Sequence, residues 1–335
     1  MTREYRDGKD TYMIYGVEST YGTGTPVAIN TVSKLQNVSY TFKNNIIVSQ
    51  GVGEGANATS VRNGNFDVSG SITVKPTEFH FLTFISGSVD GAGTSADPYK
   101  LVSGDNIGYS GTFIRTATFE LGSKSLSNNK VYTLGGASFN GWNLSGEQGA
   151  ELQLSSDFTA RDVKVGTTLT GYTPDGRSTF TFTSGSVSWN SEEFSCTQFS
   201  VGNTYPSNYP REVFDRFVKQ PTKGVRRYNW TLTANKHYDN GAGIISSDEM
   251  MNEFLGTTDH ALTSGTTNGR DLIITIKDGN GTGKTAIVQL QDSYINDWAE
   301  SPSLEGGVVS ITINGNSLAG KEEDGDNVPL KWYDE

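Results

Sequence analysis

The amino-acid sequence predicts a mainly β protein made of two tandem antiparallel β-sandwich or half-barrel domains, each with a short helix. Three observations predict this fold. The 335 residues are rich in Gly, Ser, Thr and Asn and only moderately apolar, a composition typical of many short strands joined by turns. Several segments alternate apolar and polar side chains with a period of two. The same order of elements occurs in both halves of the chain.

Strand patterns are clearest in the first half at residues 66–74, 116–121 and 152–160. In residues 66–74, apolar side chains alternate with Asp67, Ser69, Ser71 and Thr73. Strands that are apolar on one side only belong to antiparallel sheets with one solvated face. We therefore expect each half to contain a sheet with one buried and one polar face.

A glycine-rich stretch at residues 277–290, KDGNGTGKTAIVQL, looks at first like a phosphate-binding loop. Asp278 stands where the first glycine of that loop is required, and a carboxylate there would repel phosphate. A calcium loop is also excluded, because Gln289 stands where the bidentate Glu is needed. Residues 272–276 and 286–290 both alternate, so the sequence predicts a β-hairpin with a Gly/Asn link.

Helix patterns are few. Residues 77–85, TEFHFLTFI, are expected to form one short helix. Ser246 and Glu249 have the spacing of a capping box, and an apolar stripe from Met250 onward predicts a helix that ends at Gly256. Between Pro210 and Pro221, apolar residues at helical spacing predict a third helix.

The two halves suggest a duplicated organisation. We predict domains at residues 31–170 and 171–320, preceded by an N-terminal arm (1–30) and followed by a C-terminal tail (321–335). The junction, near residues 165–180, is rich in turn residues. In the second half a strand at 186–190 leads into a long insert at about 195–227, and Trp142 and Trp298 fall at matching places.

Composition and motifs give no support for an enzyme. The net charge of −11 argues against tight binding to nucleic acid, and it suits either a surface along which nucleic acid slides or ordinary solubility. One cysteine, Cys196, allows no internal disulfide, and the three histidines show no metal-ligand spacing. We predict no catalytic residues, no metal and no cofactor. We also expect no membrane span, and no signal peptide is visible at the polar start.

One further stretch carries a family resemblance. Residues 12–26, YMIYGVESTYGTGTP, resemble the opening of the tail tube proteins of long-tailed bacterial and archaeal viruses, which commonly begin with a Glu-Ser/Thr-aromatic-Gly-Thr stretch. The segments LQNVSYTFKNN, RNGNFDVSGSITV and GASFNGWNLSGEQGAELQLSSDF also fit that family. The similarity covers residues 12–162 and, more faintly, 180–316.

The resemblance implies a structural virion protein of two tail-tube-like domains, assembled in the host cytoplasm into stacked rings of the viral tail. Double-stranded DNA would pass through the hollow tube without tight binding. A trimer with two such domains per chain is favoured over a hexamer. Other implied partners are the tape measure protein and the tail terminator and baseplate proteins. The outward side chains Asp67, Ser69, Ser71 and Thr73 are candidates for lining the bore.

The resemblance also implies that long loops, at about 45–65 and 195–227, reach the adjacent ring. The candidate inter-ring residues are Gly51, Gly53, Glu54, Arg62, Val213, Phe214, Phe217, Lys219, Lys223, Arg226 and Arg227. The basic residues of the second loop either meet acidic residues of a neighbouring ring or form a solvated face. An alternative function is a tandem β-sandwich module for adhesion or carbohydrate binding, with Tyr205, Tyr209 and Trp298 stacking on sugars.

Overall fold

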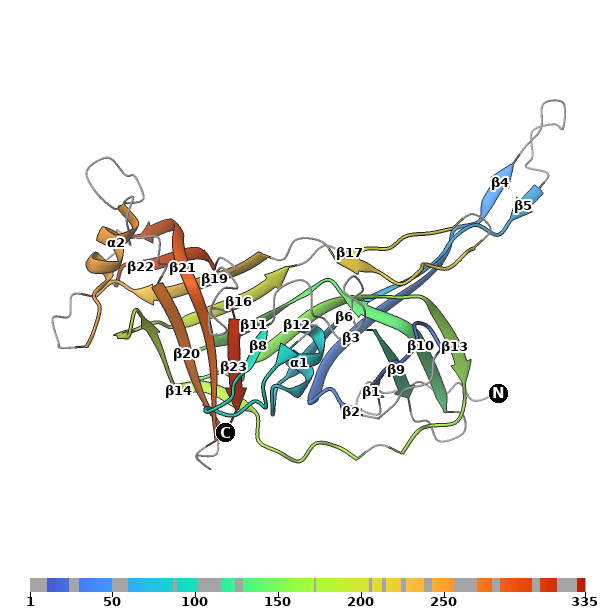
Figure 1. The fold of residues 1–335 in the computed structure, drawn as a ribbon, viewed down its shortest axis with the longest axis horizontal. Coiled ribbons are helices and arrows are strands. Elements are labelled where there is room, and N and C mark those ends of the chain that lie inside the picture. Colours follow the sequence, from blue (N-terminus) through green and yellow to red (C-terminus); the bar gives the residue numbers. More distant parts are fainter. Residues whose placement is uncertain are drawn as a thin grey trace.

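The computed structural model shows an elongated molecule built from twisted β-sheets (Figure 1). It describes residues 11–23, 30–49, 60–86, 89–101, 116–123, 129–171, 173–204, 207–212, 215–223, 227–237, 243–255, 270–278, 284–302, 308–317 and 330–334. The prediction of a mainly β, antiparallel fold is confirmed.

A central antiparallel sheet runs through both halves of the chain. Its strands lie in the order β3 (Lys34–Asn44), β6 (Phe66–Lys75), β12 (Gln153–Ala160), β11 (Gly141–Glu147), β16 (Gln198–Thr204), β19 (Arg227–Asn235), β22 (Ser310–Ser317) and β21 (Thr285–Ser301). The pair β11–β16 is therefore the junction at which strands of the first half meet strands of the second.

Two flanking groups of strands cover the buried face of the central sheet. The first contains β2 (Asn30–Thr31), β1 (Thr11–Val17), β9 (Ala117–Ser123), β10 (Lys130–Phe139) and β13 (Asp162–Gly166). The second contains β15 (Glu192–Phe194), β14 (Phe180–Trp189), β20 (Arg270–Asp278), the first part of β21, β23 (Leu330–Asp334), β8 (Tyr99–Leu101) and β7 (Val89–Asp90). An isolated bridge between Glu151 and Thr181 closes the pairings into a barrel.

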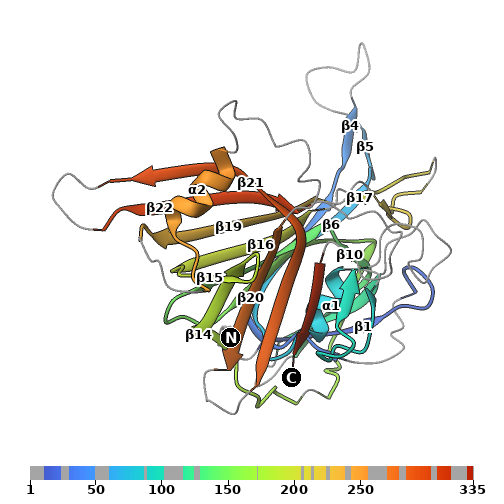
Figure 2. The same ribbon diagram turned by 60° about the vertical axis from the view of Figure 1, so that its left-hand side comes forward.

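The long strand β21 belongs to both sheets of the second half. Its first part pairs with β20 and β23, and its last part pairs with β22. The strand bends between these parts (Figure 2), where Asp292 has a φ of 48° and the pairing with β22 shifts between Ile295 and Asp297. Such a bulge redirects a strand without ending it. In the first half, two separate strands take the place of the two parts of β21: β10 in the flanking group and β11 in the central sheet.

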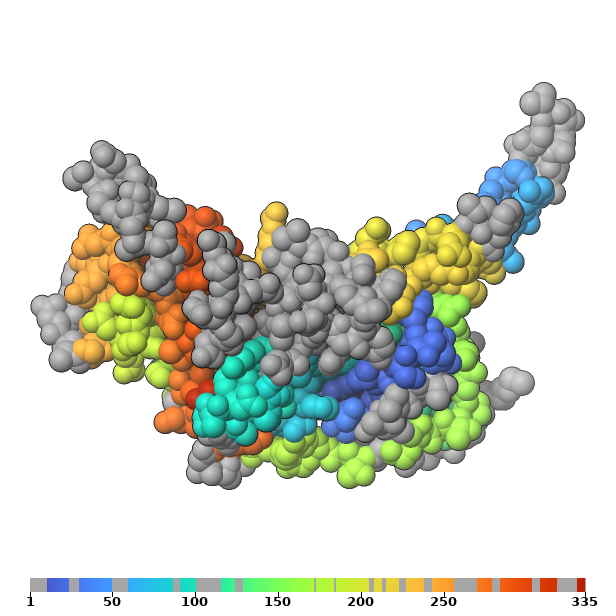
Figure 3. Space-filling model, viewed as in Figure 1, coloured from blue at the N-terminus to red at the C-terminus, as the bar shows by residue number. Residues whose placement is uncertain are grey.

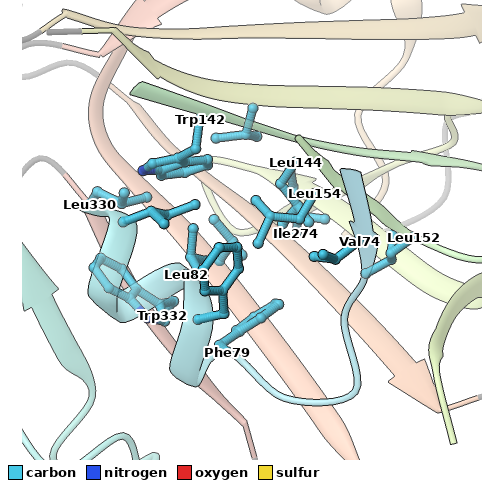
Figure 4. Close-up of a cluster of buried hydrophobic side chains, with 14 of the residues drawn as sticks. Val74, Phe79, Leu82, Trp142, Leu144, Leu152, Leu154, Ile274, Leu330 and Trp332 are labelled. Carbon is cyan, nitrogen blue, oxygen red and sulfur yellow. The ribbon is translucent and has the colours of Figure 1, made fainter. Parts of the chain in front are cut away.

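The two halves share one hydrophobic core. Helix α1 (His80–Ser86) lies inside it, and Leu82 points toward Trp332, which comes from the end of the chain (Figure 4). The Trp332 indole Nε1 donates to Thr83 Oγ1 at 3.1 Å. β8 also pairs with β23, so elements of the first half pack directly on the last strand. The division into domains at 31–170 and 171–320 stays a prediction.

Strand pairing follows the same order in both halves. β3 pairs with β6 and β6 with β12; likewise β16 pairs with β19 and β19 with β22. In the flanking groups, β9–β10 and β10–β13 correspond to β20–β21 and β21–β23. The predicted arm (1–30) contains β1 and the predicted tail (321–335) contains β23, and both strands lie within the sheets.

Two of the three predicted helices are confirmed. α1 overlaps the predicted segment 77–85, and α2 (Ser247–Leu255) follows the predicted capping box. The Ser246 N–H donates to Glu249 Oε2 at 2.8 Å, and the Glu249 N–H donates to Ser246 Oγ at 3.2 Å. The predicted hairpin is also confirmed, because Ile274 pairs with Val288 across β20 and β21. Gly256 and the hairpin link at 279–283 lie outside the described residues.

Two predictions for the second half were wrong. Residues 211–212 and 215–221 form no helix. Arg211 and Arg216 hold this segment against the β3–β6 ribbon instead: the Arg216 Nε–H donates to Gly64 O at 2.9 Å. The predicted insert at 195–227 also begins too early, because residues 198–204 form β16 in the middle of the central sheet.

Candidate functional site

The outward face of the central sheet is lined mainly by polar side chains and is here called the polar face. Alternation along the strands places mostly hydroxyl and amide side chains on it, with a few charged ones, opposite the buried face. Its members include Asn37, Ser39, Thr41, Lys43, Asp67, Ser69, Ser71, Thr73, Asn143, Ser145, Ser155, Asp157, Thr159, Ser200, Asn229, Thr231, Thr233, Thr312 and Asn314. The sequence predicted only the β6 members.

Hydrogen bonds between strands organise the polar face. They join Ser39 Oγ with Ser71 Oγ (2.7 Å), Ser200 Oγ to Asn143 Oδ1 (2.7 Å) and Thr231 Oγ1 to Asn314 Oδ1 (2.8 Å). In the described part of the chain, the Lys and Arg side chains of this face lie at or next to a strand end: Lys34, Lys43, Lys75 and Arg227. The middle of the face therefore offers few cationic groups to a phosphate.

The four predicted bore residues lie on one side of β6, opposite Val68, Ile72 and Val74. Asp67 forms an ion pair with Arg211 and accepts a hydrogen bond from Asn45. The structure brings these four side chains together along one strand, as the alternation predicts.

A β-hairpin extends the β3–β6 ribbon beyond the body of the molecule (Figures 1 and 3). It consists of β4 (Ile47–Ser49) and β5 (Ser60–Arg62), and it carries exposed apolar side chains. Ile47 is 57% exposed, Val48 54% and Val61 64%. Exposed apolar side chains gathered on a projecting ribbon mark an interaction surface.

Of the predicted inter-ring residues, Arg62 lies on this hairpin and is exposed, whereas Gly51, Gly53 and Glu54 lie outside the described residues. In the second loop, Phe217 packs edge-on against Phe66, with ring centroids 6.0 Å apart. Lys219 pairs with Asp215 at 2.8 Å and with Glu212 at 3.1 Å within its own segment. Lys223 belongs to the short strand β18 (Thr222–Lys223), paired with β17 (Ser207–Asn208), and Arg227 begins β19.

Val213, Phe214 and Arg226 lie outside the described residues, as does Tyr205, one of the aromatics proposed for sugar stacking. Tyr209 is engaged within the chain, because its hydroxyl donates to Asn140 Oδ1 at 2.6 Å. Trp298 is partly buried against the core, and its Nε1 donates to Glu300 Oε1 at 3.2 Å.

The stretch around Glu18 forms a buried polar junction. Glu18 is 1% exposed and accepts hydrogen bonds from Thr118 Oγ1 (2.7 Å), Thr116 Oγ1 (3.0 Å) and the N–H groups of Gly22 (2.9 Å) and Gly136 (3.0 Å). Several donors around one carboxylate stabilise its buried charge. This arrangement fixes the turn after β1 to β9 and β10.

The described residues contain no group of three or more His, Cys, Asp or Glu side chains able to hold a metal ion. Lys284, which follows Gly283 where a phosphate-binding loop has its lysine, donates to Thr77 O at 3.2 Å and lies over the Phe180 ring. Within the described ranges, no helix has both the length and the apolar character needed to span a membrane. Burial raises the pKa of the Cys196 thiol to about 12, which disfavours the reactive thiolate at neutral pH.

Comparison with known proteins gives one family. A search of curated proteins found no match. The family model described as phage tail tube protein matches residues 8–204, from the segment just before β1 to the end of β16, which is more than half of the chain. The protein therefore belongs to the phage tail tube protein family.

Proposed function

We propose that copies of this chain assemble into rings, and that the rings stack into a hollow tube through which viral DNA passes. Membership of the family makes the protein a structural component of the virion tail. Ring formation, stacking and DNA passage are the finer steps of the proposal. Each is supported by a separate feature of the described residues.

The proposal of ring formation rests on the central sheet. One of its faces is buried, the other is polar, and it ends in two edge strands, β3 and the last part of β21. Among the described residues, β6 is the strand that pairs with β3, and β22 is the strand that pairs with residues 297–301. Edge strands invite pairing with another chain, and closing a sheet around an axis removes its edges.

The polar face is the surface best suited to the bore. Ser71, Thr73, Asn143, Ser155 and Thr231 present short neutral side chains, several of them tied to neighbours by hydrogen bonds. Affinity for DNA comes mainly from Lys and Arg that displace counterions from phosphates. A wall of hydroxyl and amide groups therefore lets DNA move with little friction.

The repeated strand order favours a trimer over a hexamer. We propose that residues 31–170 and 171–320 are tandem tail-tube-like domains, so that three chains supply six domains around the axis. Heterologous contacts between identical chains close into a ring when the rotation per chain allows it. The internal pair β11–β16 then serves as one of two junction types around the ring.

The projecting β4–β5 hairpin is the proposed contact with the adjacent ring, together with residues 207–212 and 215–223, of which Arg211 and Arg216 bind the β3–β6 ribbon at its base. Its exposed apolar side chains, including Ile47 and Val61, would lose exposure when rings stack. The tape measure, tail terminator and baseplate proteins are the proposed partners inside the tube and at its two ends.

The experiment is to purify the chain and measure its mass by light scattering, with electron microscopy of the same sample. We expect a species of three chains, together with rings or tubes about 10 nm wide. A strictly monomeric protein at high concentration would overturn the proposal, and a glycan-array signal from that monomer would favour the carbohydrate-binding alternative.

A further inference from the structure

The structure contains one complete example of a junction between two tube-like halves, at β11–β16. The strands are antiparallel, with Leu144 opposite Val201 and Trp142 opposite Asn203. Both strands are buried along their core-facing side, where Leu144 and Val201 are each 0% exposed. We call β11, the last central-sheet strand of the first half, the exit strand, and β16, the first central-sheet strand of the second half, the entry strand. This junction shows how the two pair.

The exit strand β11 has a counterpart in the last part of β21. Leu154 in β12 lies opposite Val74 in β6, and Ile311 in β22 lies opposite Ala234 in β19. Those two pairs occupy equivalent places in the two halves. Leu154 pairs on its other side with Leu144, and Ile311 pairs on its other side with Glu300. Glu300 is therefore the counterpart of Leu144, and Trp298 is the counterpart of Trp142.

The entry strand β16 has a counterpart in β3. The pairs Gly70–Phe158 and Trp230–Gly315 lie four residues along the strands from the two pairs matched above, so they are equivalent as well. On the other side, Gly70 pairs with Tyr40 and Trp230 pairs with Val201. Tyr40 is therefore the counterpart of Val201.

Exposure separates the inner junction from its counterparts. Val201 is fully buried, whereas its counterpart Tyr40 is 39% exposed. Leu144 is fully buried, whereas its counterpart Glu300 is exposed. The same two positions are fully buried at the inner junction and exposed at the two edges of the central sheet, where Tyr40 packs on Phe42 and Tyr132 of the same chain. A second copy of the chain can supply a strand to each edge.

We propose that the end of β21 in one chain pairs antiparallel with β3 of the next chain in the register that places Glu300 opposite Tyr40. This inference rests on the ring-forming function proposed above. It copies the Leu144–Val201 pairing of the inner junction. The register then sets three further pairs between chains: Ala299 with Thr41, Trp298 with Phe42, and Asp297 with Lys43.

Two of these four pairs have complementary chemistry. On the polar face, Asp297 meets Lys43, and opposite charges directly across an antiparallel pair are favourable. On the other face, the indole of Trp298 meets the ring of Phe42, and both are only partly buried in the single chain. At the inner junction, the position of the Asp297–Lys43 pair is occupied by Gly141 and Thr204. The ion pair therefore distinguishes the junction between chains from the one within the chain.

Cysteine cross-linking tests the register in the assembled protein. In a Cys196→Ala background, Thr41→Cys and Ala299→Cys are combined, since both positions are exposed. Opposite Cα atoms in an antiparallel pair lie about 4.5–5.5 Å apart, within the range of a disulfide. Oxidation should give covalent dimers and closed trimers, and neither single variant should give them. The matched control pairs Thr41→Cys with Ser301→Cys, which become opposite only if the register slips by two residues.

Charge reversal is the second measurement. Lys43→Asp alone, or Asp297→Lys alone, should raise the protein concentration needed for assembly at least about tenfold, and the double exchange should restore it. Rings that cross-link through 41 and 301 overturn the register, and rings that cross-link through neither pair overturn the β21–β3 pairing while ring formation stands. Failure of the unmodified chain to form rings instead overturns the proposed function together with this inference.

Discussion

Gly315 in β22 lies against the indole ring of Trp230 in β19. A Cβ at Gly315 would stand 2.0 Å from Trp230 Cζ2 and 2.4 Å from the backbone oxygen of Tyr294. The first half has the same arrangement with the partners exchanged, because a Cβ at Gly70 would stand 2.5 Å from the Phe158 ring. At this equivalent strand pair, each half therefore has a large aromatic side chain on one strand and a glycine opposite it on the neighbouring strand.

Gly315→Ala should therefore destabilise the chain. Trp230 is 1% exposed and cannot move without displacing core neighbours, so we expect a loss of at least about 1–3 kcal/mol in the free energy of unfolding. Urea unfolding followed by circular dichroism measures it. The control is Gly166→Ala, because a Cβ at Gly166 meets nothing within 4 Å. An equal effect of the two substitutions would refute the packing explanation.

Glu18→Gln tests the buried junction after β1. The amide places an N–H₂ group among donors such as Thr118 Oγ1 and the Gly136 N–H, leaving buried donors without an acceptor. We expect a loss of about 2–4 kcal/mol by chemical denaturation, since an unmatched buried polar group is costly. Glu147→Gln at an exposed position is the matched control. A Glu18→Gln protein as stable as the parent would remove the structural role assigned here to this motif.

Acid pH should weaken the contact between the 173–179 segment and the start of α1. Burial raises the pKa of Asp175, but hydrogen bonds from Arg177 and Thr77 outweigh it and hold the folded pKa below its usual range. The contribution of the Asp175 carboxylate to the free energy of unfolding is therefore fully present above the ordinary Asp pKa of about 3.9. It is lost as the pH falls below that value.

The stability of the parent protein should consequently fall more steeply between about pH 5 and pH 2.5 than that of Asp175→Asn. Thermal unfolding across this range measures the difference. Glu192→Gln, at an exposed site, should follow the parent curve. Parallel curves for the parent and Asp175→Asn would show that the Arg177 contact does not stabilise the folded chain through the carboxylate charge.

The hairpin variant Ile47→Asp/Val48→Asp should separate ring formation from stacking. These side chains are 57% and 54% exposed and lie outside the core, so the fold and the ring should persist while tubes are lost. Electron microscopy distinguishes single rings from tubes. Val165→Asp, at an equally exposed apolar position on β13, is the control and should still form tubes. Tubes of normal length from the double variant would exclude this hairpin as the inter-ring contact.

Lysines on the polar face should hinder DNA passage. Ser155 and Thr312 occupy equivalent places in the two halves, so Ser155→Lys/Thr312→Lys would place six lysines around a trimeric ring. We expect virions with tails of normal length but slower DNA ejection, with the delay shrinking as salt rises because phosphate contacts are screened. Ser155→Gln/Thr312→Gln supplies similar bulk without charge. An unchanged ejection rate would mean that another face lines the bore.

Local sequence signals predicted the elements whose side-chain periodicity agrees with their final surroundings. Two patterns are complete within a few residues: the alternation at 272–276 and 286–290, and the Ser246–Glu249 spacing. They therefore predicted the β20–β21 hairpin and the start of α2 correctly. The segment 210–221 has helical spacing, yet Arg211 and Arg216 bind the distant β3–β6 ribbon, and the described residues 211–212 and 215–221 are irregular. Tertiary contacts of this kind leave no local trace.

The candidate site was predictable only in part. Alternation in β6 identified Asp67, Ser69, Ser71 and Thr73, but the polar face also needs β11, β16, β19 and β22, whose order depends on long-range pairing. Strand β16 was hidden in the predicted insert, because Gly202 and Asn203 interrupt its apolar alternation. The matching places of Trp142 and Trp298 were the sequence signal closest to the β11–β21 correspondence.

The central claim is that the polar face of a closed ring of chains lines the DNA channel. An electron-microscopy reconstruction of the assembled tube tests it most directly. We expect three chains per ring, six similar wall segments, and Ser71, Asn143 and Thr231 facing the axis. A reconstruction in which these side chains face outward, or in which the β3 and β21 edges of neighbouring chains lie apart, would contradict the account.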